Sequence, residues 1–504
     1  MKRPFMNLSR YVIKKTVARI QHESKTSTLK RTLGRWNLLS LGIGCIIGAG
    51  IFVLTGVAAA EHAGPAITFS FVIAGLACAF AGLCYAEMAS VLPVSGSAYT
   101  YAYASLGEIF AWVMGWLLIL EYGLASATVS VGWSGYIVSF LSDLGVMIPA
   151  ELTKAPGMMV TLADGSETEA IFNLPASIGI FMVTALLVVG VSESAKVNNI
   201  IVFVKVAVIL AFIAIGVFYV DPANWDPFIP ENEGPGKYGM DGVLRAASII
   251  FFAYIGFESI STAAAEAKNP QTEMPFGILG ALVVCTLLYM AVSLVLTGVT
   301  HYSTLNVADP MAVAVDAIGL GWFSFIIKVG AIMGLSSVML VLVYGQTRIF
   351  YTMSRDGLLP AIFCKVHPKF HTPYINTIFV GICVAIAGGM TPIGVLGDLV
   401  SLGTLSAFTI VSVSVLYLRW KEPELERPFR VPFSPVVPLL GIACCGYLIA
   451  QMPADIFSKL QYFFLAGIII YLAYGQRKSR LAREMFPRGG DAEFIKEAHE
   501  IRTE

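Results

Sequence analysis

Charged side chains are scarce in this 504-residue sequence. Asp, Glu, Lys and Arg make up 13% of the residues, whereas 57% are hydrophobic. A soluble domain carries about twice that charge. The formal net charge is zero, and no basic patch is interleaved with aromatic residues, so nucleic acid is not expected as a partner. This composition excludes an ordinary soluble protein and predicts a polytopic membrane protein.

Patterns typical of metal sites, disulfides and catalysis are also absent from the sequence. The eight cysteines lie mostly inside apolar runs and have neither disulfide nor metal spacing, and the six histidines are scattered. No nucleophile is paired with a base. We therefore expect no enzyme activity, no metal and no cofactor.

We expect no cleavable signal sequence at the N-terminus. Residues 1–35 contain ten Lys and Arg against one acid, Glu23, and no apolar stretch precedes the basic block. Ile13, Val17 and Ile20 could share one helical face. A short helix in the membrane interface and a solvated basic arm both fit this segment, which we predict to be cytoplasmic.

Long apolar runs dominate the rest of the chain and predict twelve membrane spans. An even number of spans and a basic N-terminus place both termini in the cytoplasm, and the basic loops agree with the positive-inside rule. The predicted divisions are a transmembrane domain over 36–475 and a cytoplasmic tail over 476–504. The predicted spans lie near 36–61, 65–92, 108–141, 171–192, 195–220, 242–266, 275–300, 320–352, 373–391, 395–419, 435–453 and 459–475.

Glycines interrupt the first span. The stretch Gly42–Phe52 has four glycines within the nine positions 42–50, and each glycine costs a helix about 1 kcal/mol relative to alanine. We expect the helix to break here and to present bare backbone N–H and C=O groups. The sixth span contains a similar interruption at Phe252–Gly256. Two broken spans in corresponding positions predict a five-plus-five inverted-repeat fold with discontinuous helices one and six.

That fold divides the domain into a first repeat over 36–220, an inverted repeat over 241–420 and accessory helices over 435–475. Free N–H groups at the first break suit a carboxylate, because they carry the positive end of a helix dipole. Carbonyl groups near Cys45–Ile46 and Phe252–Ile255 suit an ammonium. A solute with both groups, an α-amino acid, fits best; sugars and simple ions are excluded only weakly. Phe252 and Tyr254 could gate the site or simply pack.

Charges inside the spans are costly and therefore informative. Lys205 lies about 15 Å into the fifth span at 1.5 Å per residue. It could titrate as part of the transport mechanism, or Glu121 or Glu258 could neutralise it for structural reasons alone. Glu121 could orient backbone N–H groups or shuttle protons. Glu258 could cap the sixth-span break or face the solute amine, and the cap is slightly favoured.

Other charges lie nearer the ends of the spans. Glu87 is expected to be a gate or loop anchor. Arg245, Lys328 and Asp398 lie near the outer ends of their spans and are expected to snorkel toward the interface.

Several motifs in this order resemble the amino acid–polyamine–organocation superfamily, specifically bacterial members of its cationic amino acid transporter family. The resemblance runs from about Leu33 to Gly475. It is carried by Gly42–Phe52, Tyr85–Tyr101, Leu120–Tyr122, Phe252–Glu258, Glu266–Pro270, Gly345–Arg348 and Arg355–Pro360.

The resemblance implies secondary active transport of amino acids by alternating access across the cell (inner) membrane. Proton-coupled members are similar in having a lysine at the Lys205 position, so a proton is the implied coupling ion, with Glu121 and Glu258 in support. A pocket for the side chain is expected around Ser336, Met339 and Leu340. The implied substrate-binding residues are Ile46, Gly48, Ala49, Gly50, Phe252, Ala253, Ile255 and Gly256.

The chain departs from the family name, because no extra carboxylate is devoted to a cationic side chain. Small neutral amino acids such as alanine fit at least as well as arginine or lysine. Proton symport is the leading interpretation; exchange of amino acids and uniport of cationic amino acids are alternatives. A channel or sensor is disfavoured, since no selectivity filter, charge ring or signalling domain is present. The lipid bilayer is an implied partner, and a monomer is compatible with the pattern.

Overall fold

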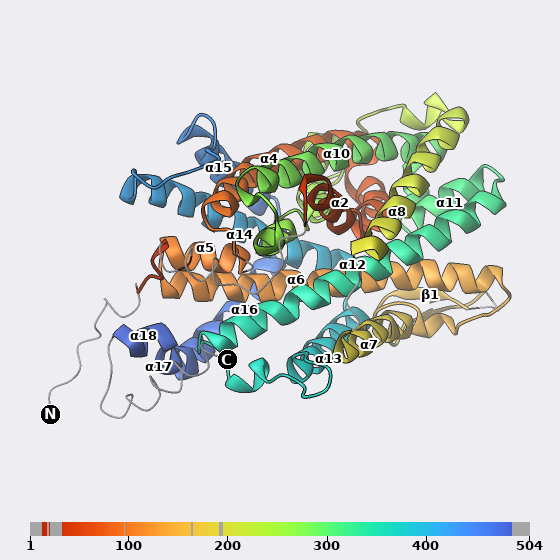
Figure 1. Ribbon diagram of the computed structural model, residues 1–504. Coiled ribbons are helices and arrows are strands. Elements are labelled where there is room, and N and C mark those ends of the chain that lie inside the picture. Colours follow the sequence, from red (N-terminus) through yellow and green to blue (C-terminus); the bar gives the residue numbers. More distant parts are fainter. Residues whose placement is uncertain are drawn as a thin grey trace.

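The chain folds into helices and one small β-hairpin in a computed structural model (Figure 1), which describes residues 13–17, 20, 33–94, 96–162, 165–190 and 195–485. The α-helices are α2 (Arg35–Ile46), α3 (Thr55–Ala58), α4 (Ile67–Val91), α5 (Ser97–Ser105), α6 (Glu108–Asp143), α7 (Leu174–Val189), α8 (Ala195–Gly216), α9 (Gly239–Ile250), α10 (Pro270–Val299), α11 (Pro310–Ala317), α12 (Gly321–Arg355), α13 (Tyr374–Met390), α14 (Ile393–Lys421), α15 (Val436–Ala450), α16 (Ala454–Ile470), α17 (Gln476–Lys478) and α18 (Arg480–Met485).

Short 3-10 and π-helical segments connect these helices, and two strands pair antiparallel in the loop after α6. The segments are η2 (Gly50–Leu54), η3 (Ala59–Ala63), η4 (Gly64–Ala66), η5 (Ala150–Leu152), η6 (Val217–Tyr219), η7 (Pro222–Trp225), η8 (Phe251–Tyr254), η9 (Glu258–Glu266), η10 (Tyr302–Leu305), η11 (Ala361–Cys364) and η12 (Tyr471–Gly475), and the strands are β1 (Met159–Thr161) and β2 (Glu167–Glu169).

Apolar side chains lie on the outside of the helix bundle as well as in its interior. This arrangement confirms an all-helical multi-pass membrane protein. Within the described residues, eight helical runs are long and apolar enough to cross a membrane, and α7, α13 and α15 are shorter apolar helices. Large apolar side chains such as Phe203 (73% exposed) and Leu287 (63% exposed) lie on the outer surface. Such a large exposed apolar surface is unfavourable in water but favourable in contact with lipid.

The count of twelve spans stays a prediction. One of the eight runs, Gly50–Val91, contains both the second half of the first predicted span and all of the second, with η4 between them. The first half of the first predicted span is α2.

The long helices run between two ends of the molecule. Figure 1 shows β1 at one end, here called the hairpin end, and α5, α17 and α18 at the other, here called the basic end. Helix α6 packs against α12 and α14, and α4 packs against α10. Helices α2, α8 and α9 pack among these long helices and position the two breaks described below.

The N-terminal segment packs against the protein at the basic end. Ile13, Val17 and Ile20 are at most 6% exposed. Lys14 Nζ donates to the Tyr417 hydroxyl (2.7 Å), and the amide N–H of Glu108 donates to the carbonyl of Ile13 (2.9 Å). These three apolar side chains are therefore buried against protein, whereas most of the segment for which the two alternatives were offered lies outside the described residues.

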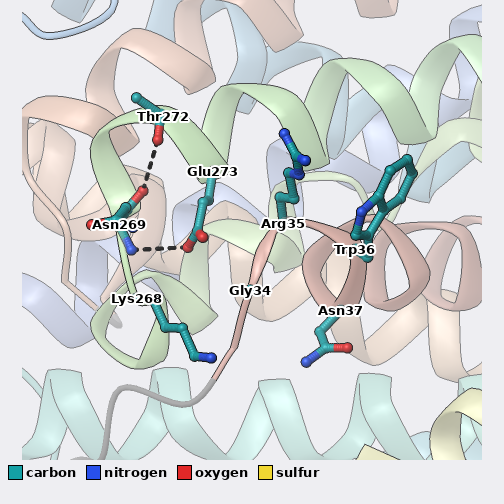
Figure 2. Close-up of a pocket in the computed structure, with 8 residues that line it drawn as sticks. All are labelled: Gly34, Arg35, Trp36, Asn37, Lys268, Asn269, Thr272 and Glu273. Atoms are coloured by element: carbon teal, nitrogen blue, oxygen red, sulfur yellow. Dashed lines mark hydrogen bonds between the residues drawn. The ribbon is translucent and has the colours of Figure 1, made fainter.

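Leu33 connects the beginning of α2 to the segment that precedes α10. Its amide donates to the carbonyl of Glu266 (3.0 Å), and the amide of Lys268 donates to the carbonyl of Leu33 (2.9 Å). Figure 2 shows the two chain segments side by side at this point. The beginnings of α2 and α10, which are far apart in the sequence, are thus linked directly.

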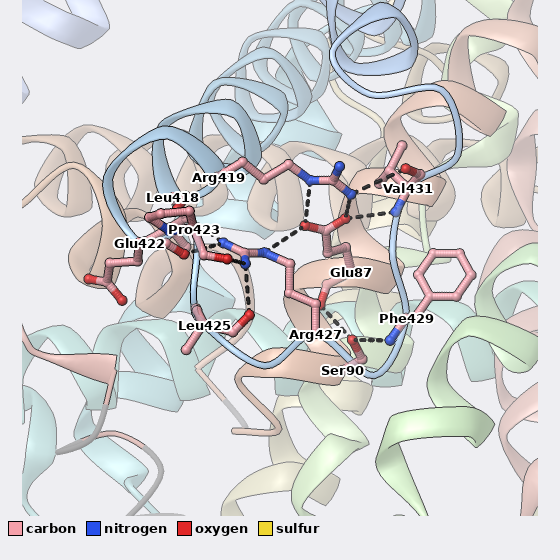
Figure 3. A network of polar contacts seen from close by, with 10 residues as sticks. All are labelled: Glu87, Ser90, Leu418, Arg419, Glu422, Pro423, Leu425, Arg427, Phe429 and Val431. Atoms are coloured by element: carbon pink, nitrogen blue, oxygen red, sulfur yellow. Dashed lines mark hydrogen bonds and ion pairs between the residues drawn. The ribbon is translucent and has the colours of Figure 1, made fainter.

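A buried carboxylate anchors the loop after α14. Glu87 is 2% exposed and accepts hydrogen bonds from Arg419 Nε (3.0 Å) and from the amide of Val431 (2.7 Å), and Arg427 Nε lies 3.4 Å from it (Figure 3). Glu87 therefore holds α4, α14 and the following loop together. This geometry is that of the expected loop anchor.

Charges at the hairpin end pair with each other, and the sequence analysis did not predict this pairing. Arg245 contacts Asp398 at 2.6 Å, and both residues are under 9% exposed. Lys328 contacts Asp143, also at 2.6 Å. Each buried charge thus has an opposite charge beside it, and removing one partner would leave the other buried and uncompensated.

Removing the Glu87 carboxylate should destabilise the fold. Glu87→Ala leaves two arginines at the basic end without their shared counter-ion, and we expect the free energy of unfolding to fall by about 3 kcal/mol. The thermal midpoint in detergent measures this loss. Asp455→Asn, which breaks an exposed ion pair with Lys459, is the control and should leave the midpoint unchanged. Equal midpoints for both variants would refute the anchor.

Candidate solute-binding site

The first helix breaks after Ile46, where the sequence predicts it. Ile47 adopts an extended conformation (ψ +99°), and a π-helical segment, η2, begins at Gly50. Among the described residues, the amide N–H groups of Gly48 and Ala49 have no hydrogen-bond partner. These donors lie at the beginning of a helical segment, where anions bind well.

The second break separates η8 from η9. Ile255 is extended (ψ +135°) and Gly256 has a φ of +122°, a conformation that an L-residue rarely adopts. The Glu258 carboxylate accepts the Gly256 amide with both oxygens (3.1 and 2.9 Å). A short-range hydrogen bond thus holds the backbone of Gly256 in this conformation, which is the cap-like geometry.

The two breaks contact each other at glycine. A Cβ added at Gly50 would lie 2.3 Å from Ala253 Cα, and one added at Gly256 would lie 2.7 Å from the backbone carbonyl of Cys45. Both distances are too short for any side chain. The backbones of the two interrupted helices therefore touch, because glycine stands at both contacts.

A small cavity lies between the breaks. Its volume is about 10 Å³, room for about one water molecule, so an amino acid enters only if the helices move apart. The lining includes six of the eight predicted substrate-binding residues; Ala253 and Gly256 adjoin it instead, in the contacts just described. The lining residues are Cys45, Ile46, Gly48, Ala49, Gly50, Ala125, Val129, Phe252, Ile255, Val338 and Leu342.

The side-chain part of this lining differs from the prediction. Helix α12 contributes Val338 and Leu342, not Ser336, Met339 and Leu340, because the helix is rotated relative to the predicted face. Ser336 instead accepts a hydrogen bond from Trp133 Nε1 (2.9 Å). Tyr254 does not line the cavity either: its hydroxyl donates to the carbonyl of Phe71 (2.8 Å) on α4, as the packing alternative expects.

Lys205 on α8 reaches the C-terminal end of α2. Its Nζ donates to the carbonyls of Gly44 (2.8 Å) and Ile47 (3.2 Å), and the residue is fully buried. A Cβ at Gly334 on α12 would lie 3.0 Å from Lys205 Cγ, so a glycine there leaves room for the lysine side chain. The ammonium thus interacts with the negative end of the broken helix.

A family model described as amino acid permease matches residues 33–474. The chain belongs to the amino acid permease family. The permease is 48% identical to the branched-chain amino acid permease BcaP of Bacillus subtilis (strain 168), over 91% of this chain and 96% of that protein. It is 47% identical to the methylthioribose transporter of the same organism, over 93% of this chain and 98% of that protein.

More distant relatives agree with these matches. The permease is 37% identical to the vacuolar cationic amino acid transporter 4 of Arabidopsis thaliana, over 79% of this chain and 64% of that protein. The resemblance to the amino acid–polyamine–organocation superfamily is therefore confirmed. The family is one of transporters, not enzymes.

Tyr289 on α10 of the permease connects the two breaks, and the sequence analysis missed it. Its hydroxyl lies 2.9 Å from the carbonyl oxygen of Ile46 and 3.0 Å from that of Ala253. Both carbonyls had been expected to be open to an ammonium. A hydroxyl donates one hydrogen bond at a time, so one of the two remains available. A tyrosine at mid-depth in an apolar span was the available signal.

The two buried glutamates of the permease differ. Glu258 is hydrogen-bonded to the break, as described above. Glu121 is fully buried on α6, and neither of its oxygens has a hydrogen-bond partner among the described residues. In this conformation the backbone of the break is therefore oriented by Glu258 and not by Glu121.

Filling the contact between the breaks should disable the permease. Gly50→Ala places a Cβ against the backbone of Ala253, which cannot yield as a flexible side chain would, and overpacking costs about 1–3 kcal/mol. We expect a lower thermal midpoint and at least tenfold weaker amino acid binding. Gly446→Ala, where nothing lies within 4 Å of an added Cβ, is the control. Wild-type binding by Gly50→Ala would contradict the close contact.

Proposed function

We propose that this permease carries neutral, branched or aliphatic α-amino acids across the cell membrane by proton-coupled alternating access. One observation carries the proposal: an apolar cavity lies between two helix breaks that offer amide donors on one side and a carbonyl acceptor on the other. The donors suit the carboxylate of the solute, and the acceptor suits its ammonium.

The proposal includes the finer architecture. Twelve spans form two inverted repeats, 36–220 and 241–420, with helices 435–475 as accessories. The basic end lies in the cytoplasm with both termini, as the positive-inside rule requires. The breaks after Ile46 and after Tyr254 then occupy corresponding positions in the two repeats.

Apolar side chains around the cavity support an aliphatic substrate. Ala125, Val129, Val338 and Leu342 line it, and no described lining residue carries a charged side chain. A buried cationic side chain would need a carboxylate partner. The proposed substrate class therefore agrees with the name of the branched-chain relative and not with that of the plant cationic transporters.

A second candidate substrate is methylthioribose. The observation that favours it is the 47% identity to a transporter of that name. A thio-sugar has neither a carboxylate nor an ammonium, so it would leave the amide donors of the first break without a charged partner. We therefore rank it second.

Proton coupling is assigned to Lys205. A protonated Lys205 attracts the carbonyl end of α2 and stabilises the packing of α2 against α8 and α12. Loss of the proton removes the charge and weakens that contact, so protonation can bias the movement of α2. Glu121 is a further proton carrier in this proposal. Its carboxyl group is buried, and among the described residues no hydrogen bond holds either oxygen, so the group is free to take up or release a proton.

The affinity for an amino acid should increase with the aliphatic surface area of its side chain. Each buried CH₂ contributes about 0.8 kcal/mol, so leucine should bind at least tenfold more tightly than alanine. Isoleucine and valine should also bind, whereas arginine and lysine should not. Thermal-shift titration of the purified protein measures these affinities. Tighter binding of methylthioribose than of leucine would select the second candidate.

Lys205→Met should uncouple transport from the proton gradient. In proteoliposomes with an imposed pH gradient, the wild type should accumulate labelled leucine, whereas Lys205→Met should only equilibrate it while still binding it. Lys328→Met, which changes a buried lysine near the hairpin end, is the matched control and should accumulate leucine normally. Accumulation driven by sodium at fixed pH would contradict proton coupling. Uptake only into vesicles preloaded with amino acid would indicate an exchanger.

A further inference from the structure

A second cavity, of about 510 Å³, lies at the basic end, away from the solute site. Residues 34–37 line one side of it, and Lys268, Glu273 and their neighbours at the beginning of α10 line the other (Figure 2). None of these residues lines the cavity between the breaks. The cavity therefore belongs to a different site.

The charges around this cavity are two cations and one carboxylate. Neither Arg35 nor Lys268 has an ion-pair partner among the described residues, and both are exposed. Glu273 is half-buried, and its Oε2 accepts the amide N–H of Asn269 (2.9 Å). The cavity thus offers cations for a phosphate together with one acceptor for an ammonium.

Aromatic side chains place the cavity at the membrane surface. Trp36 is 64% exposed, and its ring packs edge-to-face on Phe276 at 5.4 Å between centroids. The Arg35 guanidinium lies 5.7 Å from the Trp36 ring and 5.9 Å from the Phe276 ring. Exposed tryptophan beside arginine is typical of the level where helices enter the lipid headgroups. Acyl chains can therefore follow Trp36 and Phe276 while a headgroup occupies the cavity.

We propose that this cavity binds the headgroup of a phospholipid that carries both a phosphate and a primary ammonium, as phosphatidylethanolamine does. Lys268 binds the phosphate, and Arg35, whose guanidinium lies beside the Trp36 and Phe276 rings, adds positive charge on the other side of the cavity. The Glu273 carboxylate accepts a hydrogen bond from the ammonium. A choline headgroup has no N–H to donate to Glu273, and a purely anionic headgroup has no ammonium and would leave the Glu273 carboxylate without a charged donor.

A bound headgroup would link the ends of the two broken helices. Arg35 begins α2, and Lys268 follows η9, which continues the second broken helix. The lipid therefore adds a bridge to the hydrogen bonds of Leu33 and should slow the separation of these segments. This last consequence depends on the proposed transport cycle, whereas lipid binding does not.

Native mass spectrometry of the purified protein tests the site without measuring transport. Phosphatidylethanolamine, phosphatidylcholine and phosphatidylglycerol are titrated separately, and the retained lipid is counted. We expect phosphatidylethanolamine to be retained best, and Lys268→Ala to weaken its retention about tenfold, since one charge-assisted hydrogen bond is lost. Glu273→Gln, which can still accept the Asn269 amide, should shift the preference toward phosphatidylglycerol.

The control is Lys421→Ala. Lys421 also lies at the basic end beside an exposed tryptophan, with Nζ 4.9 Å from the Trp420 ring centroid, but it does not line the cavity. Its loss should change retention less than twofold. Equal losses in both lysine variants, or equal retention of the three lipids, would overturn the proposal. Displacement of the lipid by an equal concentration of free phosphoethanolamine would assign the site to a soluble anion instead.

Discussion

The structure depends on the contact between two interrupted helices. Backbone polar groups inside a membrane must be satisfied, so an unwound segment survives only where protein surrounds it. Here each break is buried against the other, with Gly50 against Ala253 and Gly256 against Cys45. This contact shields the unwound backbone from the lipid. It also places amide donors and carbonyl acceptors around one small cavity.

Three side chains complete this arrangement, and each satisfies a different part of the exposed backbone. Lys205 interacts with the carbonyl end of α2, Glu258 fixes the amide of Gly256, and Tyr289 lies between carbonyls of both breaks. They come from α8, η9 and α10, so movement of any of these helices alters the cavity. In the proposed transport cycle, these hydrogen bonds to the backbone connect solute binding with the movement of the helices.

The sequence predicts the features whose free-energy cost arises at single residues. Glycine at four of nine positions marks the first break, and a lysine deep in an apolar span marks Lys205 as important, because helix propensity and burial act on each residue where it stands. Features that depend on tertiary contacts were missed or wrong. Arg245 and Asp398 are 153 positions apart and pair only after α9 and α14 pack. Tyr289 looks like any core tyrosine until both breaks lie beside it, and the rotation of α12 decides that Val338 faces the cavity.

The account is tested most directly by asking which groups of the solute are needed. Labelled leucine bound to the purified permease is competed with leucine, with 4-methylpentanoate, which lacks the amine, and with 3-methylbutylamine, which lacks the carboxylate. The account predicts that each analogue competes at least about a hundredfold more weakly than leucine, because a buried polar group of the site stays unpaired. Competition by either analogue as strong as that of leucine would contradict recognition by the two helix breaks.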